Sequence, residues 1–96
     1  MTQGLEAALA VGRTLRVSVI SPTSVGFEGE ATSITAPAHD GEVGILYGHA
    51  PMLVLLGEGD LVVHAPDGER RFHVARGFLQ VVENEVSVLA EEVEAR

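Results

Sequence analysis

The 96-residue sequence predicts an all-β fold, an antiparallel β-sandwich or flattened barrel of eight to ten short strands. Three observations lead to this class. Apolar and polar residues alternate with a period of two in several short runs, which is typical of half-buried strands. Eleven glycines break the chain into short segments, as in small sandwiches and barrels. An Asp-Gly pair also separates two runs rich in β-formers, a strong hairpin signal.

The first half of the chain is expected to contain a leader and the first strands. Residues 1–13 are predicted to be a flexible leader with at most a turn or two of helix, because so short a helix is marginal. The β-sandwich domain is predicted over residues 14–90. Its first strands are expected at 15–19, 25–30, 31–37 and 42–46, followed by a buried apolar strand at 52–56.

The second half predicts two hairpins. In the first, residues 61–65 and 70–75 flank Pro66-Asp67-Gly68. In the second, residues 78–82 and 86–89 pair across residues 83–85. Residues 91–96 are predicted to be a C-terminal tail, and the acidic segment from Ala90 to Arg96 could begin a helix.

The stretch from Gly41 to Leu53 is the most informative part of the sequence. Gly41 and Gly48 are predicted to take positive φ in turns, since glycine does so without steric cost. Pro51 lacks an N–H group and favours an extended residue before it, so residues 48–51 should form a rigid corner. Glu42 and His49 are expected on the exposed parts of this stretch.

Composition excludes several classes of function. The formal net charge of −8 and the absence of lysine disfavour nucleic acids and anionic membrane surfaces. The absence of lysine also excludes a biotinyl or lipoyl carrier domain, which needs an acceptor lysine. The sequence has no cysteine, which excludes disulfides and thiolate chemistry. No apolar run approaches the ~20 residues that span a bilayer.

Candidate chemical sites are weak. His39, Asp40, Glu42 and His49 fall within a short segment and could suggest a metal site, but solvent-facing turns are the favoured interpretation. His64 and His73 lie on two arms of one hairpin and could face each other, yet two histidines do not complete a site. No phosphate-binding glycine motif or serine nucleophile motif occurs. We therefore expect no catalytic residues, no cofactor and no metal.

The sequence nevertheless resembles one family, the epsilon subunits of F-type ATP synthases (called delta in mitochondria). The resemblance is carried by the order of five segments across residues 14–93, and an ordered set is more specific than a single motif. These segments are LRVSVISPTSVGFEGE (15–30), SITAPA (33–38), GEVGILYGHAPML (41–53), GDLVV (59–63) and GFLQVVENEVSVL (77–89).

The resemblance implies a non-catalytic subunit of the rotary central stalk that contacts the gamma subunit and the c-ring. It helps to couple ion translocation to ATP synthesis or hydrolysis. It implies a peripheral position on the cytoplasmic face of a bacterial inner membrane, or on the matrix or stromal face in an organelle. Contacts with the c-ring or gamma are carried over to Glu42, Val43, Gly44 and His49, in a loop shaped by Gly41, Gly48 and Pro51.

Three departures from the family pattern qualify this expectation. Tyr47 and Arg76 stand where the family usually has proline and glycine, and each adds a side chain at an expected interface. Most members continue into a C-terminal helical hairpin that carries inhibition and ATP sensing. The sequence resembles short members without it, so we expect no ATP binding. Two alternatives remain. One is a free-standing acidic β-sandwich adaptor that binds another protein. The other is a small cupin-like metalloenzyme, although the paired histidine motif of cupins is absent from this sequence.

Overall fold

The computed structural model describes residues 13–96, so the predicted leader lies outside the described residues apart from Arg13. Every element in this part of the chain is a strand, which confirms the all-β prediction. The eight strands are β1 (Leu15–Ile20), β2 (Val25–Ala31), β3 (Ser33–Ala38), β4 (Gly41–Leu46), β5 (Met52–Leu55), β6 (Gly59–Ala65), β7 (Gly68–Val82) and β8 (Glu85–Ala95).

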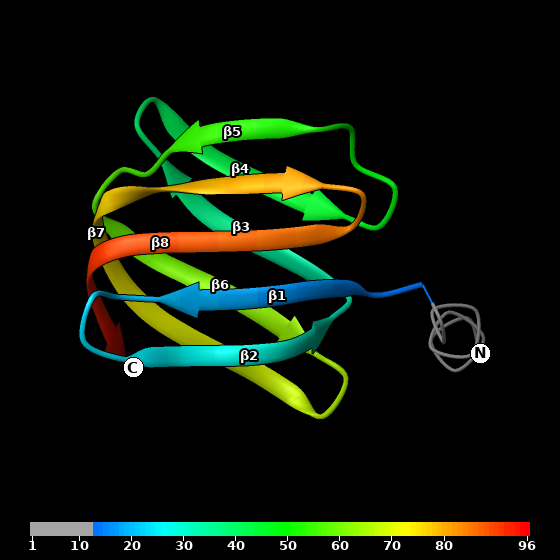
Figure 1. Ribbon diagram of the computed structural model, residues 1–96, viewed down its shortest axis with the longest axis horizontal. Helices are drawn as coiled ribbons and strands as arrows, with labels where there is room; N and C mark the ends of the chain where they lie inside the picture. Colours follow the sequence, from blue (N-terminus) through cyan, green and yellow to red (C-terminus); the bar gives the residue numbers. More distant parts are fainter. Residues whose placement is uncertain (1–12) are drawn as a thin grey trace.

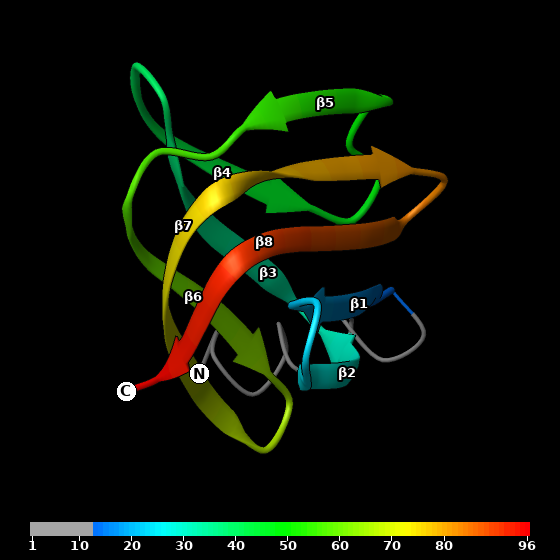
Figure 2. The ribbon, with the colours of Figure 1, turned by 60° about the vertical axis from the view of Figure 1, so that its left-hand side comes forward.

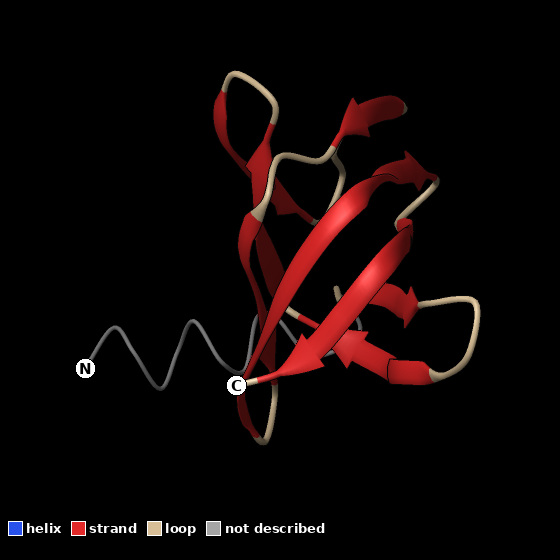
Figure 3. Cartoon of the chain, turned by 90° about the vertical axis from the view of Figure 1, so that its left-hand side faces the viewer, coloured by secondary structure: helices blue, strands red, loops and turns tan. Residues whose placement is uncertain are grey.

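The strands form one hydrogen-bonded sheet that folds over itself into two layers (Figure 1). One layer contains β5, β1, β2 and the adjoining parts of β7 and β8. The other contains β4, β3, β6 and the remaining parts of β7 and β8. The edge-on view shows the long curved strands passing from one layer to the other (Figure 3). The predicted sandwich is therefore closed by strands that belong to both layers.

The bend of β7 corrects the predicted division of residues 70–82 into two strands. Residues 68–74 of β7 pair with β6, and residues 78–81 pair with β5 on the same edge of the strand. Arg76 stands between these parts with a φ of 60°. A single left-handed residue thus turns one continuous strand from the layer of β6 into the layer of β5.

The C-terminal segment also differs from the prediction. Residues 91–95 continue β8, pairing with β7 as far as Phe72 opposite Ala95, so the possible helix after Ala90 is wrong. Val93 packs against the core, which favours the strand over a solvated helix. The predicted division of the chain into leader, domain and tail remains a prediction.

The pairing of β1 with β8 is parallel, an exception to the predicted antiparallel arrangement. β1 lies between β8 and β2, and its alternating side chains Leu15, Val17 and Val19 point into the core. The core lies between the two layers. Its largest fully buried side chains are Leu15, Ile34, Ile45, Leu61, Leu79, Val17, Val19, Val63, Val74, Val81, Val86 and Val88.

The two predicted hairpins are present, with tighter turns than expected. Ala65 pairs with Gly68, so only Pro66 and Asp67 form the first turn. Val82 pairs with Glu85 across Glu83 and Asn84, whose φ angles are 49° and 64°. Positive φ at both central residues is typical of a type I′ turn, whose twist matches that of the flanking strands.

Candidate functional site

The predicted contact segment lies at an open edge of the sandwich, which we call the β4–β5 edge. β4 ends the main strand order and pairs only with β3 among the described strands, and β5 pairs only with β7. The connection from β4 to β5 therefore crosses from one layer to the other at a free edge (Figure 2). Side chains of both strands are exposed there, among them Glu42, Leu46 and Leu53. At the far end of β5 the edge is closed, because the His39 N–H donates a hydrogen bond to the Leu55 carbonyl at 3.0 Å.

The corner at residues 46–51 is built as a tight turn. The His49 N–H donates a hydrogen bond to the Leu46 carbonyl at 3.1 Å, and Gly48 has a φ of 85°. A positive φ at this position is what a type II turn requires. The predicted positive φ values are confirmed at Gly48 and at Gly41, where φ is 148°.

Asn84 attaches this corner to the rest of the fold. The Gly48 N–H donates a hydrogen bond to Asn84 Oδ1 at 2.7 Å, and the Arg16 N–H donates to the Asn84 carbonyl at 2.8 Å. One residue in the β7–β8 turn therefore holds both the corner and the start of β1. Asn84 tolerates its left-handed backbone better than most residues because its short side chain suits that region.

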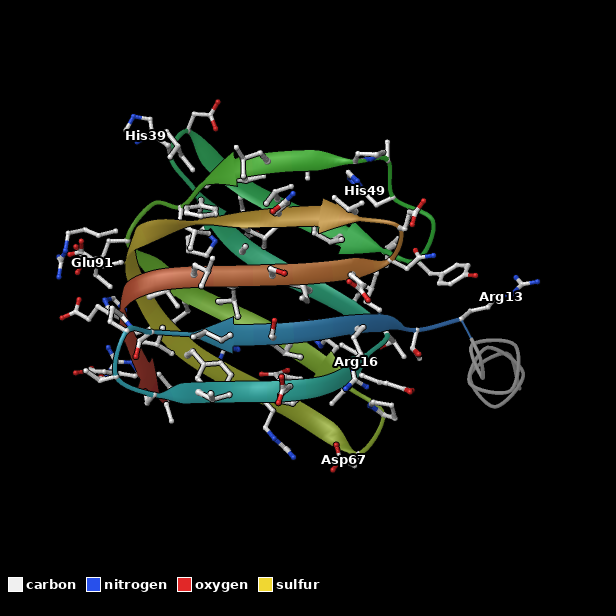
Figure 4. All side chains as sticks on the ribbon, viewed as in Figure 1. Arg13, Arg16, His39, His49, Asp67 and Glu91 are labelled. Carbon is white, nitrogen blue, oxygen red and sulfur yellow. The ribbon has the colours of Figure 1, made fainter. Side chains whose placement is uncertain are left out.

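The structure separates the two polar residues that the sequence placed together. Glu42 is exposed near the start of β4, whereas His49 follows the end of that strand. Four residues of strand alone span roughly 13 Å. His39, three residues before Glu42, and His49 lie at opposite ends of the edge (Figure 4). The segment therefore presents two separate polar positions, and the candidate cluster of His39, Asp40, Glu42 and His49 does not assemble as one metal site.

The His49 ring has a defined local partner. Its Nδ1 lies 2.8 Å from the Ala50 carbonyl, and a carbonyl can only accept, so Nδ1 carries the proton. Nε2, the other ring nitrogen, takes no part in this hydrogen bond. His49 is half-buried, whereas Gly48, Ala50 and Pro51 are exposed.

Val43 and Gly44 have different environments. Val43 is half-buried and packs against the core, so it supports the strand more than it presents a surface. Gly44 is exposed, and a Cβ added there would meet nothing within 4 Å. The side chains of Tyr47 and Arg76, the two departures from the family pattern, are both largely exposed.

An exposed set of apolar side chains was missed by sequence reasoning. Leu53 and Leu55 are 68% and 67% exposed. The predicted buried strand is therefore half-buried on its other face, at Met52 and Val54, and fully buried only at Leu56. Strand pairing places four more apolar residues in line with Leu55 across one layer, and each of them is exposed or half-buried. We call this set the apolar row: Leu55, Phe78, Leu89, Ile20 and Val25.

A sequence signal for the apolar row does exist. Met52-Leu53-Val54-Leu55 is apolar at every position, and Phe78-Leu79 places apolar residues on both faces of β7. Strands covered on both faces have such continuous runs, whereas a half-exposed strand alternates. In residues 13–96 one face of these strands is uncovered, so the continuous apolar pattern is not accounted for by burial within the sandwich.

Residues 13–96 contain no helix of the length and apolar character needed to cross a bilayer.

The sequence profile of the family described as "ATP synthase, Delta/Epsilon chain, beta-sandwich domain" matches residues 14–96.

Similar proteins agree with this match. The ATP synthase epsilon chain of Leptospira borgpetersenii is 39% identical over 77 residues, covering 80% of this chain and 61% of that protein. The epsilon chain of Endomicrobium trichonymphae is 33% identical over 75 residues, covering 78% and 54%. The chain thus spans somewhat over half the length of these curated relatives.

Solved structures show the same fold. A chain of the Euglena gracilis mitochondrial ATP synthase, in a structure of its OSCP, F1 and c-ring, superposes with a TM-score of 0.80 at 21% identity, covering 86% of this chain and 54% of that one. A chain from the Tetrahymena thermophila enzyme, in a structure of its central stalk and c-ring, gives 0.69 at 17% identity, covering 82% and 64%.

Fold and surface together define a small β-sandwich domain with an exposed edge and an uncovered apolar face. The chain belongs to the ATP synthase delta/epsilon-chain β-sandwich family.

Proposed function

We propose that this chain is a non-catalytic subunit of the central stalk of a rotary F-type ATP synthase. In this role it bridges the gamma subunit and the c-ring and helps to couple ion translocation to ATP synthesis or hydrolysis. It is peripheral to the membrane, on the cytoplasmic face in a bacterium or on the matrix or stromal face in an organelle. The family match over residues 14–96 and the titles of the similar structures support this role.

The apolar row is the observation that most favours a place inside an assembly. Leu55, Phe78 and Leu89 lie side by side on three adjacent strands and are 67%, 37% and 41% exposed. Contiguous exposed apolar surface on a small domain is typical of a contact with another protein. Burial of such side chains contributes roughly 25 cal/mol per Å² of apolar area. We assign this face to the gamma subunit.

The β4–β5 edge is assigned to the c-ring. Glu42, Gly44 and His49 supply the exposed part of the contact, Val43 supports the strand from the core side, and Gly41, Gly48 and Pro51 hold the segment in shape. Glu42 and His49 lie far apart on this edge, so they contact different places on the partner. Substitutions at sites more than about 7–10 Å apart usually add. The two residues should therefore contribute to docking independently, through exposed polar contacts of about 0.2–1 kcal/mol each.

Binding to gamma tests the first assignment. Phe78→Glu with Leu89→Glu should abolish co-purification with gamma, because two charges would be buried against an apolar surface. Arg70→Glu is the control, since it adds negative charge at the exposed tip of the β6–β7 hairpin. Normal gamma binding by the folded double variant would exclude the apolar row as the contact.

The ratio of ion pumping to ATP hydrolysis tests the second assignment in reconstituted complexes. Glu42→Ala and His49→Ala should each lower this ratio modestly, and the double variant should lower it by about the sum of their free-energy effects. A double variant that stays bound to gamma and pumps as many ions per ATP as the parent would refute the assignment to the c-ring.

A further inference from the structure

A second group of polar residues surrounds His73, away from the β4–β5 edge. We propose that Glu58, His73 and Glu92 form a binding site for a divalent transition-metal ion of the zinc class, with Asp60 orienting the histidine. The inference rests on side-chain geometry and is independent of the proposed role in the stalk.

Strand register brings the three ligands together. Glu58 lies just before β6, His73 is on β7 and Glu92 is on β8. Asp60 pairs with His73, and Ala75, two residues along the same face of β7, pairs with Glu92. One ligand atom from each of the three residues lies within 4.8 Å of the other two. Their separation in sequence explains why no ligand motif is visible there.

The distances suit a small ion. His73 Nε2 and Glu58 Oε2 are 3.2 Å apart. Zinc–nitrogen and zinc–oxygen bonds are about 2.0–2.2 Å, so neighbouring ligands of a tetrahedral site are roughly 3.4 Å apart. The histidine and Glu58 are therefore already placed as a ligand pair. Glu92, with a carboxylate oxygen within 4.8 Å of both other ligand atoms, is the third ligand, and water can take the fourth position.

Asp60 supplies the supporting contact that metal-binding histidines usually have. Its Oδ1 lies 3.5 Å from His73 Nδ1, on the opposite side of the ring from Glu58. Arg71 Nη1 lies 3.5 Å from the other oxygen of Asp60. A carboxylate facing Nδ1–H holds the ring in the tautomer whose Nε2 lone pair is available to a metal. The His73 side chain is only 20% exposed, which limits its freedom.

Charge favours a dication over an ordinary ion pair. Three carboxylates, from Glu58, Asp60 and Glu92, surround one imidazole. Of these three, only Asp60 contacts Arg71, whose other partner is Glu69 outside the group. Like charges at this spacing repel one another, and a bound dication relieves that repulsion. An imidazole ligand favours zinc-like ions over magnesium or calcium, which take oxygen ligands. The histidine must be neutral to ligate, so binding releases to solvent any proton held at Nε2.

Calorimetric titration of the chelator-treated 96-residue chain with zinc chloride tests the proposal. We expect one ion per chain. His73→Gln and Glu92→Gln should each weaken affinity by more than tenfold, and Asp60→Asn by about 10–100-fold. Zinc should also raise the thermal midpoint of the parent but not of His73→Gln. Circular dichroism establishes that each variant is folded.

His64 provides the matched control. It lies on the same hairpin, with Nδ1 4.0 Å from Glu69 Oε1, but belongs to no three-ligand group among residues 13–96. His64→Gln should bind zinc as the parent does, and a nitrogen NMR signal of His73 should shift on binding. Absence of saturable zinc binding by the parent, parent-like binding by His73→Gln, or equal loss in His64→Gln would overturn the proposal.

Discussion

The chain changes direction at the β4–β5 corner and at the bend of β7, and each place has one residue in the left-handed conformation. The role of the glycine differs between the two. At the corner between β4 and β5, Gly48 adopts the left-handed conformation with a φ of 85°. At the bend of β7, Arg76 adopts it with a φ of 60°, and Gly77 follows. At the corner a glycine relieves backbone strain, whereas at the bend the glycine stands beside the strained residue.

The surroundings explain this difference. A Cβ built on Gly48 would meet nothing within 4 Å, so that glycine is required only for its φ. A Cβ built on Gly77 would lie 2.0 Å from the Leu89 carbonyl oxygen and 2.5 Å from Ala90 Cα. Gly77 is therefore required for space, because β7 passes very close to β8 there. The comparison separates two physical reasons for a glycine that look alike in sequence.

The largest effect should come from Gly77→Ala. The added methyl group meets backbone atoms of β8, which cannot move aside as a flexible side chain can. We expect a loss of about 3 kcal/mol in the free energy of unfolding, at the upper end of overpacking effects. Urea denaturation measures it. An unchanged midpoint would show that the two strands separate easily at the bend.

Gly48→Ala should have an intermediate effect. The new side chain fits, but alanine at a φ of 85° is strained by about 1–2 kcal/mol. Urea denaturation should therefore show a smaller loss than for Gly77→Ala. A loss as large as that of Gly77→Ala would mean that crowding also matters at the corner.

At Arg76 the opposite substitution, to glycine, tests whether the left-handed backbone is strained. We expect Arg76→Gly to be more stable than Arg76→Ala by about 1 kcal/mol, because only glycine takes this φ without strain. Both variants lose the exposed ion pair between Arg76 Nε and Glu91 Oε1 at 3.1 Å, so the comparison cancels that contact. Thermal unfolding of the two variants side by side decides the sign, and equal midpoints would show that the bend relaxes.

The smallest effect on stability is expected at the proposed contact residues. Glu42→Ala and His49→Ala should change the free energy of unfolding by less than about 0.5 kcal/mol, as is usual for surface positions. Urea midpoints of the isolated variants check this. A large loss would mean that any docking defect reflects unfolding instead of a missing contact.

Local patterns predicted most of the fold. Alternation placed the inward side chains of β1 correctly, and the Asp-Gly signal located the β6–β7 hairpin within one residue. The predictions failed where distant segments decide the outcome. Residues 91–95 have a composition that suits a helix end, yet their partners on β7 make them a strand. The parallel pairing of β1 with β8 likewise has no local signal.

The candidate site was predictable only in part. Positive φ at Gly41 and Gly48 followed from residue type and is confirmed. The separation of Glu42 from His49 could have been foreseen, because an extended strand carries its ends apart. The exposure of Leu53 and Leu55 could not have been foreseen. Apolar residues at every position of a strand indicate burial, but they do not indicate what covers the strand. The group around His73 depends on the register of three strands and therefore appears only in the folded chain.

The pairing of β1 with β8 has a consequence for synthesis on the ribosome. In this pairing Arg16 lies opposite Glu85, and β8 is the last of the eight strands to be translated. At a translation rate of about 5–20 residues per second, β1 waits several seconds with only β2 beside it. The sheet cannot close gradually from its first strand. The edge of β1 that faces β8 instead stays unpaired until the last of the eight described strands has been made.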